Sequence, residues 1–97
     1  MAAVEVMPLD ISEMLDSDAT IAEYLRLAAE DPNPDVFLSA LGDVARARGM
    51  SALAQKTGLG RESLYKALTP GGNPTYATLR KVMDALNVRL QVAANAP

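Results

Sequence analysis

Two clusters of proline and glycine break the chain into short helical stretches. The segments "DPNPD" at 31–35 and "TPGGNP" at 69–74 are strongly punctuated, and Gly49, Gly58 and Gly60 interrupt the residues between them. Proline disfavours a continued helix and glycine suits the position just after a helix end, so these residues mark boundaries between helices. The remaining stretches have apolar residues at the spacing of one helix face. Such a chain predicts a bundle of short helices.

The predicted fold class is all-α, in a single domain of 97 residues with one hydrophobic core. Residues 1–34 form an acidic N-terminal arm and helix, and residues 35–97 form the core. Side chains that accept hydrogen bonds from free backbone N–H groups mark the helix starts. The predicted elements are an irregular arm over 1–17, a helix over about 19–30 capped by Asp18, a helix from a cap at Asp35 to Gly49, a helix from a cap at Ser51 to Gly58, a helix over about 61–68, a helix from a cap at Thr75 to about 87, and a short C-terminal β-strand over 88–92.

The predicted strand, "VRLQV" at 88–92, alternates apolar and polar residues. A lone strand cannot satisfy its own backbone hydrogen bonds. It therefore has to pair with the N-terminal arm, with a second copy of the chain or with another protein. Pairing with a second copy would make this strand an edge for homodimerisation.

The chain contains no cysteine and no histidine. Disulfides, thiol or imidazole metal sites and nucleophilic triads that need either residue are therefore excluded. Pairs of acidic residues occur without a neighbouring base or nucleophile, so we expect no enzyme, no catalytic residue, no metal and no cofactor. No signal pattern and no run of about 18 apolar residues occurs, which predicts a cytoplasmic protein without a membrane partner.

Charge is distributed unevenly along the chain. Residues 1–43 contain ten acidic residues and one basic residue, a formal charge of −9, whereas residues 44–97 contain eight basic and two acidic residues, a formal charge of +6. At physiological salt the screening length is about 8 Å, so two ends of one domain can present nearly independent potentials. The basic half remains a candidate for binding nucleic acid despite the net charge of −3.

Residues 50–68 have the spacing of a helix-turn-helix. Ala54 is small where the two helices would cross, and Gly58 supplies the left-handed turn residue four positions later. The second helix would then project its N-terminal residues into the major groove of DNA. The apolar positions that let this pair pack on its neighbours are Leu53, Leu59, Leu64 and Ala67 or Leu68.

The second helix of this pair carries side chains suited to DNA. Arginine can bind guanine through two hydrogen bonds, glutamate can accept one from cytosine, and lysine can reach guanine or a phosphate. Hydroxyl groups can contact phosphates, and backbone N–H groups at a helix start can hold one. The predicted DNA-binding residues are Arg61, Glu62, Ser63, Tyr65 and Lys66 on this helix, with Ser51 and Thr75 at the starts of two other helices.

A simpler interpretation of the same residues is a two-helix corner that never meets DNA. Short helix pairs with a glycine between them are common. In that case Glu62 and Lys66 form a surface ion pair at the i, i+4 spacing, which stabilises a helix by about 0.2–0.5 kcal/mol.

The sequence resembles a known family at this point. The segment "LGDVARARGMSALAQKTGLGRESLYKALTPGGNPTYATLRKVMDALNVRL" resembles the core of the addiction-module antidote family, and "DSDATIAEYLRLA" resembles its N-terminal helix, so the resemblance covers roughly 9–92. These are small, prophage-type, Xre/Cro-like helix-turn-helix antitoxins, the HigA-like partners of RelE/ParE/HigB-type toxins. The resemblance implies a five-helix, lambda-repressor-like fold, an operator recognised through Arg61, Glu62, Ser63 and Lys66, and autorepression together with a toxin.

Gly60 departs from the pattern of that family. A serine or threonine is more typical at this position, just before the second helix of the pair. Glycine is a tolerable cap that costs only a few tenths of a kcal/mol, but it removes a hydroxyl that could bind phosphate.

The acidic half of the chain has two interpretations. Its carboxylates are either the solvated face of an amphipathic helix or an electrostatic match for a basic partner. A strongly acidic segment steers association with a basic protein, and the family resemblance implies a RelE-superfamily toxin in that role. The predicted toxin-binding residues are Asp16, Asp18, Glu23 and Tyr24.

Three functions therefore remain open. The first is an antitoxin that binds operator DNA as a homodimer, represses its own transcription and neutralises a toxin. The second is a stand-alone prophage transcription regulator without a toxin. The third is a protein-interaction module that does not bind DNA. A homodimer is expected for the first two, since one recognition helix reads few base pairs.

Overall fold

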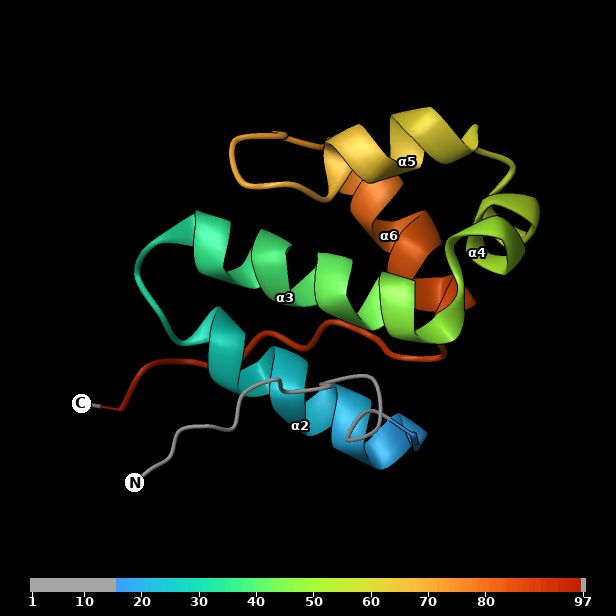
Figure 1. The fold of residues 1–97 in the computed structure, drawn as a ribbon. Helices are drawn as coiled ribbons and strands as arrows, with labels where there is room; N and C mark the ends of the chain where they lie inside the picture. Colours follow the sequence, from blue (N-terminus) through green and yellow to red (C-terminus); the bar gives the residue numbers. More distant parts are fainter. Residues whose placement is uncertain (1–15, 97) are drawn as a thin grey trace, which may run out of the picture.

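The computed structural model describes residues 16–96, and five helices run through them (Figure 1). The predicted helices occur in the predicted order, with ends within about two residues of those expected. The predicted arm over 1–17 lies almost entirely outside the described residues. The helices are α2 (Asp18–Ala29), α3 (Pro34–Arg48), α4 (Met50–Thr57), α5 (Arg61–Ala67) and α6 (Tyr76–Ala85).

Two of the predicted helix caps are wrong by one or two residues. Ser17, not Asp18, caps α2, because its hydroxyl oxygen accepts a hydrogen bond from the backbone N–H of Thr20 at 3.1 Å. Asn33, not Asp35, caps α3, and its side-chain oxygen accepts from the N–H of Asp35 at 3.0 Å. Several residues able to cap stand side by side at both sites, so sequence alone does not identify the one with extended backbone.

The start of α4 also differs from the prediction, whereas the start of α6 agrees with it. Gly49 precedes α4 with a φ of 101° and makes no side-chain cap, so Ser51 lies inside the first turn instead of capping it. Thr75 caps α6 as predicted, and its hydroxyl oxygen accepts from the N–H of Thr78 at 3.1 Å.

The predicted C-terminal β-strand is wrong. Residues 88–96 contain neither strand nor helix, and residues 16–96 as a whole contain no strand. The segment from Val88 to Ala93 runs beside α2, together with which it lines a groove. A helix keeps its interior backbone N–H and C=O groups in its own hydrogen bonds, so it offers no edge to which a strand can pair. Within residues 16–96 this segment therefore has no strand to pair with.

The apolar side chains of this segment become more exposed from its start to its end. Val88 packs partly buried against the core, Leu90 is 44% exposed and Val92 is completely exposed. Only the first of the three apolar side chains anchors the segment to the domain.

The hydrophobic core is organised around α3, which lies between α2 on one side and α5 on the other (Figure 1). Leu41, Val44 and Ala45 of α3 are completely buried. Burying a side chain such as leucine or valine stabilises a fold by about 1.5–3 kcal/mol. The other helices contribute Ile21 and Leu25 from α2, Met50 and Leu53 from α4, Leu64 from α5, Leu68 from just beyond α5, and Val82 and Leu86 from the end of the chain's last helix and its cap.

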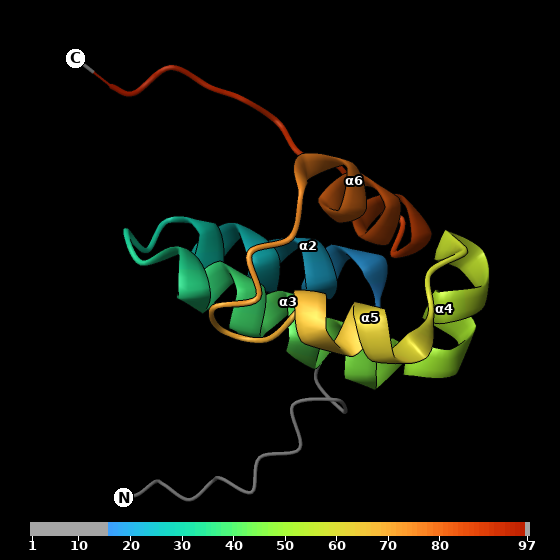
Figure 2. The same ribbon diagram turned by 90° about the horizontal axis from the view of Figure 1, so that it is seen from above.

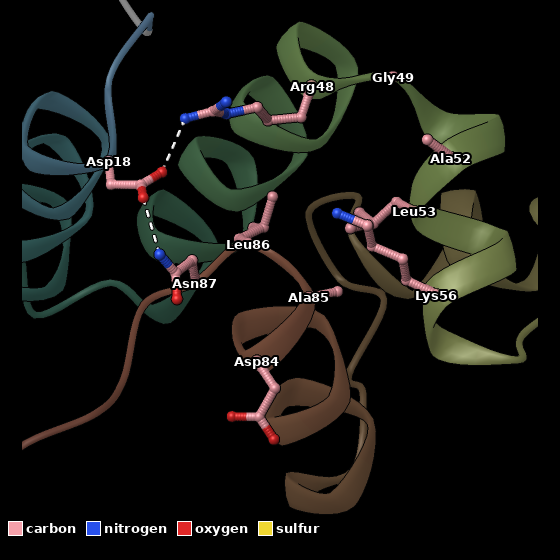
Figure 3. Close-up of a pocket in the computed structure, with 10 residues that line it drawn as sticks. All are labelled: Asp18, Arg48, Gly49, Ala52, Leu53, Lys56, Asp84, Ala85, Leu86 and Asn87. Carbon is pink, nitrogen blue, oxygen red and sulfur yellow. Dashed lines mark hydrogen bonds and ion pairs between the residues drawn. The ribbon is translucent and has the colours of Figure 1, made fainter.

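Asp18 links three helix ends (Figure 3). Its carboxylate accepts a hydrogen bond from Nη2 of Arg48 at 3.0 Å and another from Nδ2 of Asn87 at 2.7 Å. Asn87 has a φ of 64°, a left-handed conformation that asparagine adopts more easily than most residues. These contacts join the start of α2 to the ends of α3 and α6. They are exposed, so each contributes little to stability and their effect is to align the helices.

A hydrogen bond between Tyr24 and Asp43 fastens α2 to α3. The Tyr24 hydroxyl donates to Oδ2 of Asp43 at 2.8 Å, and Arg46 donates to the other carboxylate oxygen at 2.7 Å. Burial, first, and then the hydrogen bond to the Asp43 carboxylate together raise the pKa of Tyr24 to about 12. The folded chain therefore holds the phenolic proton more tightly than the unfolded chain does.

We predict that Tyr24→Phe lowers the melting temperature at about pH 8 and that this deficit shrinks as the pH rises from about 10 towards 12. The pKa of Tyr24 is higher in the folded state than in the unfolded state, so the wild type is fully stabilised below its unfolded pKa and loses that stabilisation as Tyr24 ionises. Thermal unfolding of both proteins across this range measures the difference. A deficit that stays constant over the whole range would contradict the prediction.

A second prediction concerns Gly72, in the loop between α5 and α6. A Cβ atom at this position would collide with the carbonyl oxygen of Lys66 and would lie 2.7 Å from that of Ala67 and 2.9 Å from that of Thr69. We expect Gly72→Ala to reduce the free energy of unfolding by about 1–3 kcal/mol, as overpacking does. Urea unfolding measures this change.

Gly60→Ala provides the matched control. Gly60 has a φ of −66°, and the nearest atom to an added Cβ is the Ser63 hydroxyl oxygen at 3.9 Å. Alanine fits there without strain. Equal losses of stability for the two variants would contradict the crowding at Gly72.

Candidate nucleic-acid interface

The turn between α4 and α5 has the geometry predicted from the glycine spacing. Gly58 has a φ of 74°, and its N–H donates to the carbonyl oxygen of Ala54 at 3.0 Å. This left-handed conformation strains residues that carry a side chain but not glycine. Helix α5 begins three residues later, at Arg61, so a tight turn joins the two helices.

Thr57 fixes this turn through hydrogen bonds that the sequence analysis did not anticipate. Its hydroxyl donates to the carbonyl oxygen of Leu53 at 2.9 Å and accepts from the N–H of Leu59 at 3.2 Å. Among residues 16–96, Thr57 is also the only polar residue that is buried. A threonine directly before a glycine that ends a helix is the sequence signal that could have indicated it, since such hydroxyls often bond to nearby backbone.

Helix α5 buries one side and exposes the other. Leu64 is completely buried and Leu68, just after the helix, is 2% exposed, whereas Tyr65 is 47% exposed. All five predicted DNA-binding side chains of this helix, Arg61, Glu62, Ser63, Tyr65 and Lys66, are exposed. The helix lies at the edge of the molecule, on the side away from α2 (Figures 1 and 2).

The charged side chains of α5 form no ion pair within residues 16–96. Among residues 16–96, ion pairs involve α2 and α3, and none joins Glu62 to Lys66. Arg61, Glu62, Tyr65 and Lys66 line a shallow recess along the helix. The surface ion pair of the simpler interpretation is therefore not formed, and four side chains able to bind a ligand share one open face.

The loop that follows α5 is tied back to α3. The backbone N–H of Gly71 donates to Oδ1 of Asp35 at 2.9 Å, a contact across 36 positions of sequence. Gly71 and Asn73 both have positive φ, 82° and 52°. This contact holds the loop in place ahead of α6, and it gives Asp35 a structural role different from the predicted cap.

The start of α6 brings Thr75 near further basic side chains. The hydroxyl group of Thr75 is engaged with Thr78, whose N–H and Oγ1 both lie 3.1 Å away. Tyr76 is 61% exposed, and the guanidinium of Arg80 lies 5.9 Å from its ring centroid and donates to its hydroxyl at 3.3 Å. This hydrogen bond raises the pKa of Arg80. The other predicted phosphate contact, Ser51, is exposed on α4.

The four predicted toxin-binding residues lie at or near α2, and three of them are engaged within the chain. Asp18 joins helix ends, and Tyr24 binds Asp43. Glu23 pairs with Arg26 at 2.6 Å, and this hydrogen bond lowers the pKa of the Glu23 carboxyl. Asp16 precedes the helix and is exposed. The predicted set is therefore not one open patch of free carboxylates.

Two further properties of residues 16–96 bear on the kind of site present. Their helices lack the length and apolar character that crossing a membrane requires. Within the same range, no three acidic side chains gather closely enough to hold a metal ion.

Comparison with known proteins relates nearly the whole chain to one family. The protein-family model described as "Probable addiction module antidote protein" matches residues 5–94. A protein of Haemophilus influenzae described as "Uncharacterized protein" is 49% identical over 88 residues, which make up 91% of this chain and 91% of that protein. No solved structure matches the chain.

Proposed function

The chain belongs to the family of probable addiction module antidote proteins, and we propose that it is the antitoxin of a type II toxin–antitoxin module that also binds operator DNA. The family supplies the antitoxin role and implies a toxin as partner. The observation that carries the DNA-binding part is the exposed face of α5, where Arg61, Glu62 and Lys66 have no ion-pair partner among residues 16–96.

The proposed DNA contact places the N-terminal part of α5 in the major groove. Arg61 stands at the first position of the helix and can bind a guanine edge, while Lys66 one turn later can reach a second base or a phosphate. Tyr65 and Ser63 offer hydroxyls to the backbone. The burial of Leu64 and Leu68 fixes which side of the helix faces outward.

The start of α6 is the proposed second point of contact with the DNA backbone. Arg80 and Lys81 lie in its first turns, and its free N–H groups favour an anion. The Thr75 hydroxyl is already hydrogen-bonded to Thr78. The proposed contact with a DNA phosphate is therefore made by the basic side chains and the backbone N–H groups.

Autorepression requires two copies of this site. A single recognition helix reads only a few base pairs, and paired half-sites lie about 34 Å apart, one turn of DNA. We therefore propose that the chain binds its operator as a homodimer. Repression by the antitoxin and neutralisation of a RelE-superfamily toxin complete the proposed function.

The proposed DNA contact predicts that the chain binds the DNA upstream of its own gene. Arg61→Ala and Lys66→Ala should each weaken specific binding about tenfold or more, as the loss of a base contact does. Electrophoretic mobility shift at two salt concentrations measures this. Binding that neutralises several phosphates must weaken steeply as salt rises.

Arg26→Ala is the control for that experiment. It removes a positive charge of the same type from α2, on the side of the molecule away from α5. Equal effects of the α5 variants and of Arg26→Ala would refute the proposed interface, and an absence of binding at low salt would favour a protein-interaction module.

The proposed antitoxin role predicts that the chain forms a complex with the protein encoded by the adjacent reading frame. It also predicts that the chain restores growth to cells in which that protein is toxic. Co-expression with pull-down tests the complex, and a growth-rescue assay tests neutralisation. DNA binding without either result would indicate a stand-alone regulator instead of an antitoxin.

A further inference from the structure

The outer flank of the α2–α3 hairpin carries an apolar groove that nothing in the described chain covers. Its two large apolar side chains are Leu27, which is 54% exposed, and Val36, which is 36% exposed. Ala28, Ser39 and Ala40 also line it, as do Tyr24 and Asp43, which are joined by a hydrogen bond. The groove is therefore formed by side chains held in place by the contact between α2 and α3.

The exposure of Leu27 follows from its position on the helix. Ile21 and Leu25 point into the core, and Leu27 falls on a different side of α2. A single exposed leucine is ordinary, but two exposed aliphatic side chains beside one groove mark a contact surface. Leu27 does not belong to the core and no residue among 16–96 covers it, so within the described part of the chain its side chain is open to a partner.

The surroundings of the groove are acidic. Apart from the Asp18–Arg48 pair, five acidic residues on α2, on α3 and in the turn between them, Glu23, Glu30, Asp31, Asp35 and Asp43, outnumber the two bases Arg26 and Arg46. Arg46 pairs with Asp43 at 2.7 Å. Arg26 is held between Glu23 at 2.6 Å and Glu30 at 2.9 Å, so its charge is already shared by two carboxylates. The rim of the groove therefore has an excess of negative charge.

This charge decides between the two kinds of occupant that the groove could take. A second copy of the chain, related by a two-fold axis, would bring this acidic rim against an identical acidic rim. Like charges brought together in this way oppose association. A partner with basic residues around an apolar side chain matches both the rim and the groove.

We propose that the Leu27–Val36 groove is the docking surface for a basic protein that inserts an apolar side chain between α2 and α3. This inference rests on the proposed function, in which that protein is the toxin. It moves the contact from the predicted carboxylates, three of which are engaged within the chain, to apolar side chains beside them. The groove involves α2, which lies on the side of the molecule away from α5, so the basic protein and DNA can be bound at the same time (Figure 1).

The test measures binding of the purified protein encoded by the adjacent reading frame to the full-length chain by isothermal titration calorimetry. We expect Leu27→Ser to weaken binding at least tenfold. Leu90→Ser is the matched control, because Leu90 is exposed to a similar extent, 44%, on the C-terminal segment. We expect that control to bind as the wild type does. Circular dichroism melting checks that both variants remain folded.

A second pair of variants tests the charge of the rim. Glu23→Lys and Asp84→Lys change the net charge equally, but Glu23 lies one turn before Leu27 on α2 whereas Asp84 lies on α6. We expect Glu23→Lys to weaken binding several-fold at low salt and the difference to fade as salt is raised. We expect Asp84→Lys to have little effect.

The remaining outcomes separate the two levels of the proposal. Wild-type binding that Leu27→Ser leaves unchanged would overturn the docking surface while the antitoxin function stands. A failure of the wild type to bind would overturn the antitoxin function and the docking surface with it. If Leu27→Ser instead converts a dimer of the chain alone into monomers in analytical ultracentrifugation, the groove is an interface between copies and the proposal is wrong.

Discussion

The burial of α3 is the constraint on which the rest of the structure depends. Leu41, Val44 and Ala45 of this helix are removed completely from water, and they share one core with side chains of α2, α4, α5 and α6. Because an amphipathic helix of this length is stable only when its apolar side is packed, the short helices around α3 fold through these contacts and not alone. The position of α3 also separates α2 from α5 (Figure 1).

Because of this separation, acidic and basic parts of the sequence are also separated in space. Helix α2, in the acidic half of the chain, and helix α5, which carries Arg61 and Lys66, lie on opposite sides of α3 (Figure 1). In the proposed function, those sides meet partners of opposite charge, a basic protein and DNA. A domain with one central helix can hold both surfaces without either partner covering the other, and the tie between Asp35 and Gly71 links the acidic turn to the loop that precedes α6.

Part of the candidate sites could be predicted from the sequence, and the polar contacts within the fold could not. The exposed side chains of α5 were predicted, because Leu64 and Leu68 fix the buried side of a helix through local spacing. The engagement of Asp18 and Tyr24 was not predicted, because their partners Asn87 and Asp43 lie 69 and 19 positions away. A carboxylate that sequence assigns to a partner protein can be consumed by a contact within the fold, and spacing gives no sign of it.

The sequence by itself determined the helices, the turn at Gly58 and the division of charge between the two halves of the chain. The helices follow from local apolar periodicity, the turn follows from the backbone freedom of glycine, and the charge division follows from composition. None of the three requires knowledge of contacts between distant residues. Only the tertiary structure decided that residues 88–92 form no strand, that Ser17 and Asn33 cap their helices, and that Leu27 and Val36 share an uncovered groove. The strand and the groove each require a second segment of chain, which the sequence does not place beside the first. The caps are local contacts, but several neighbouring residues can make them and only the backbone conformation in the fold selects one.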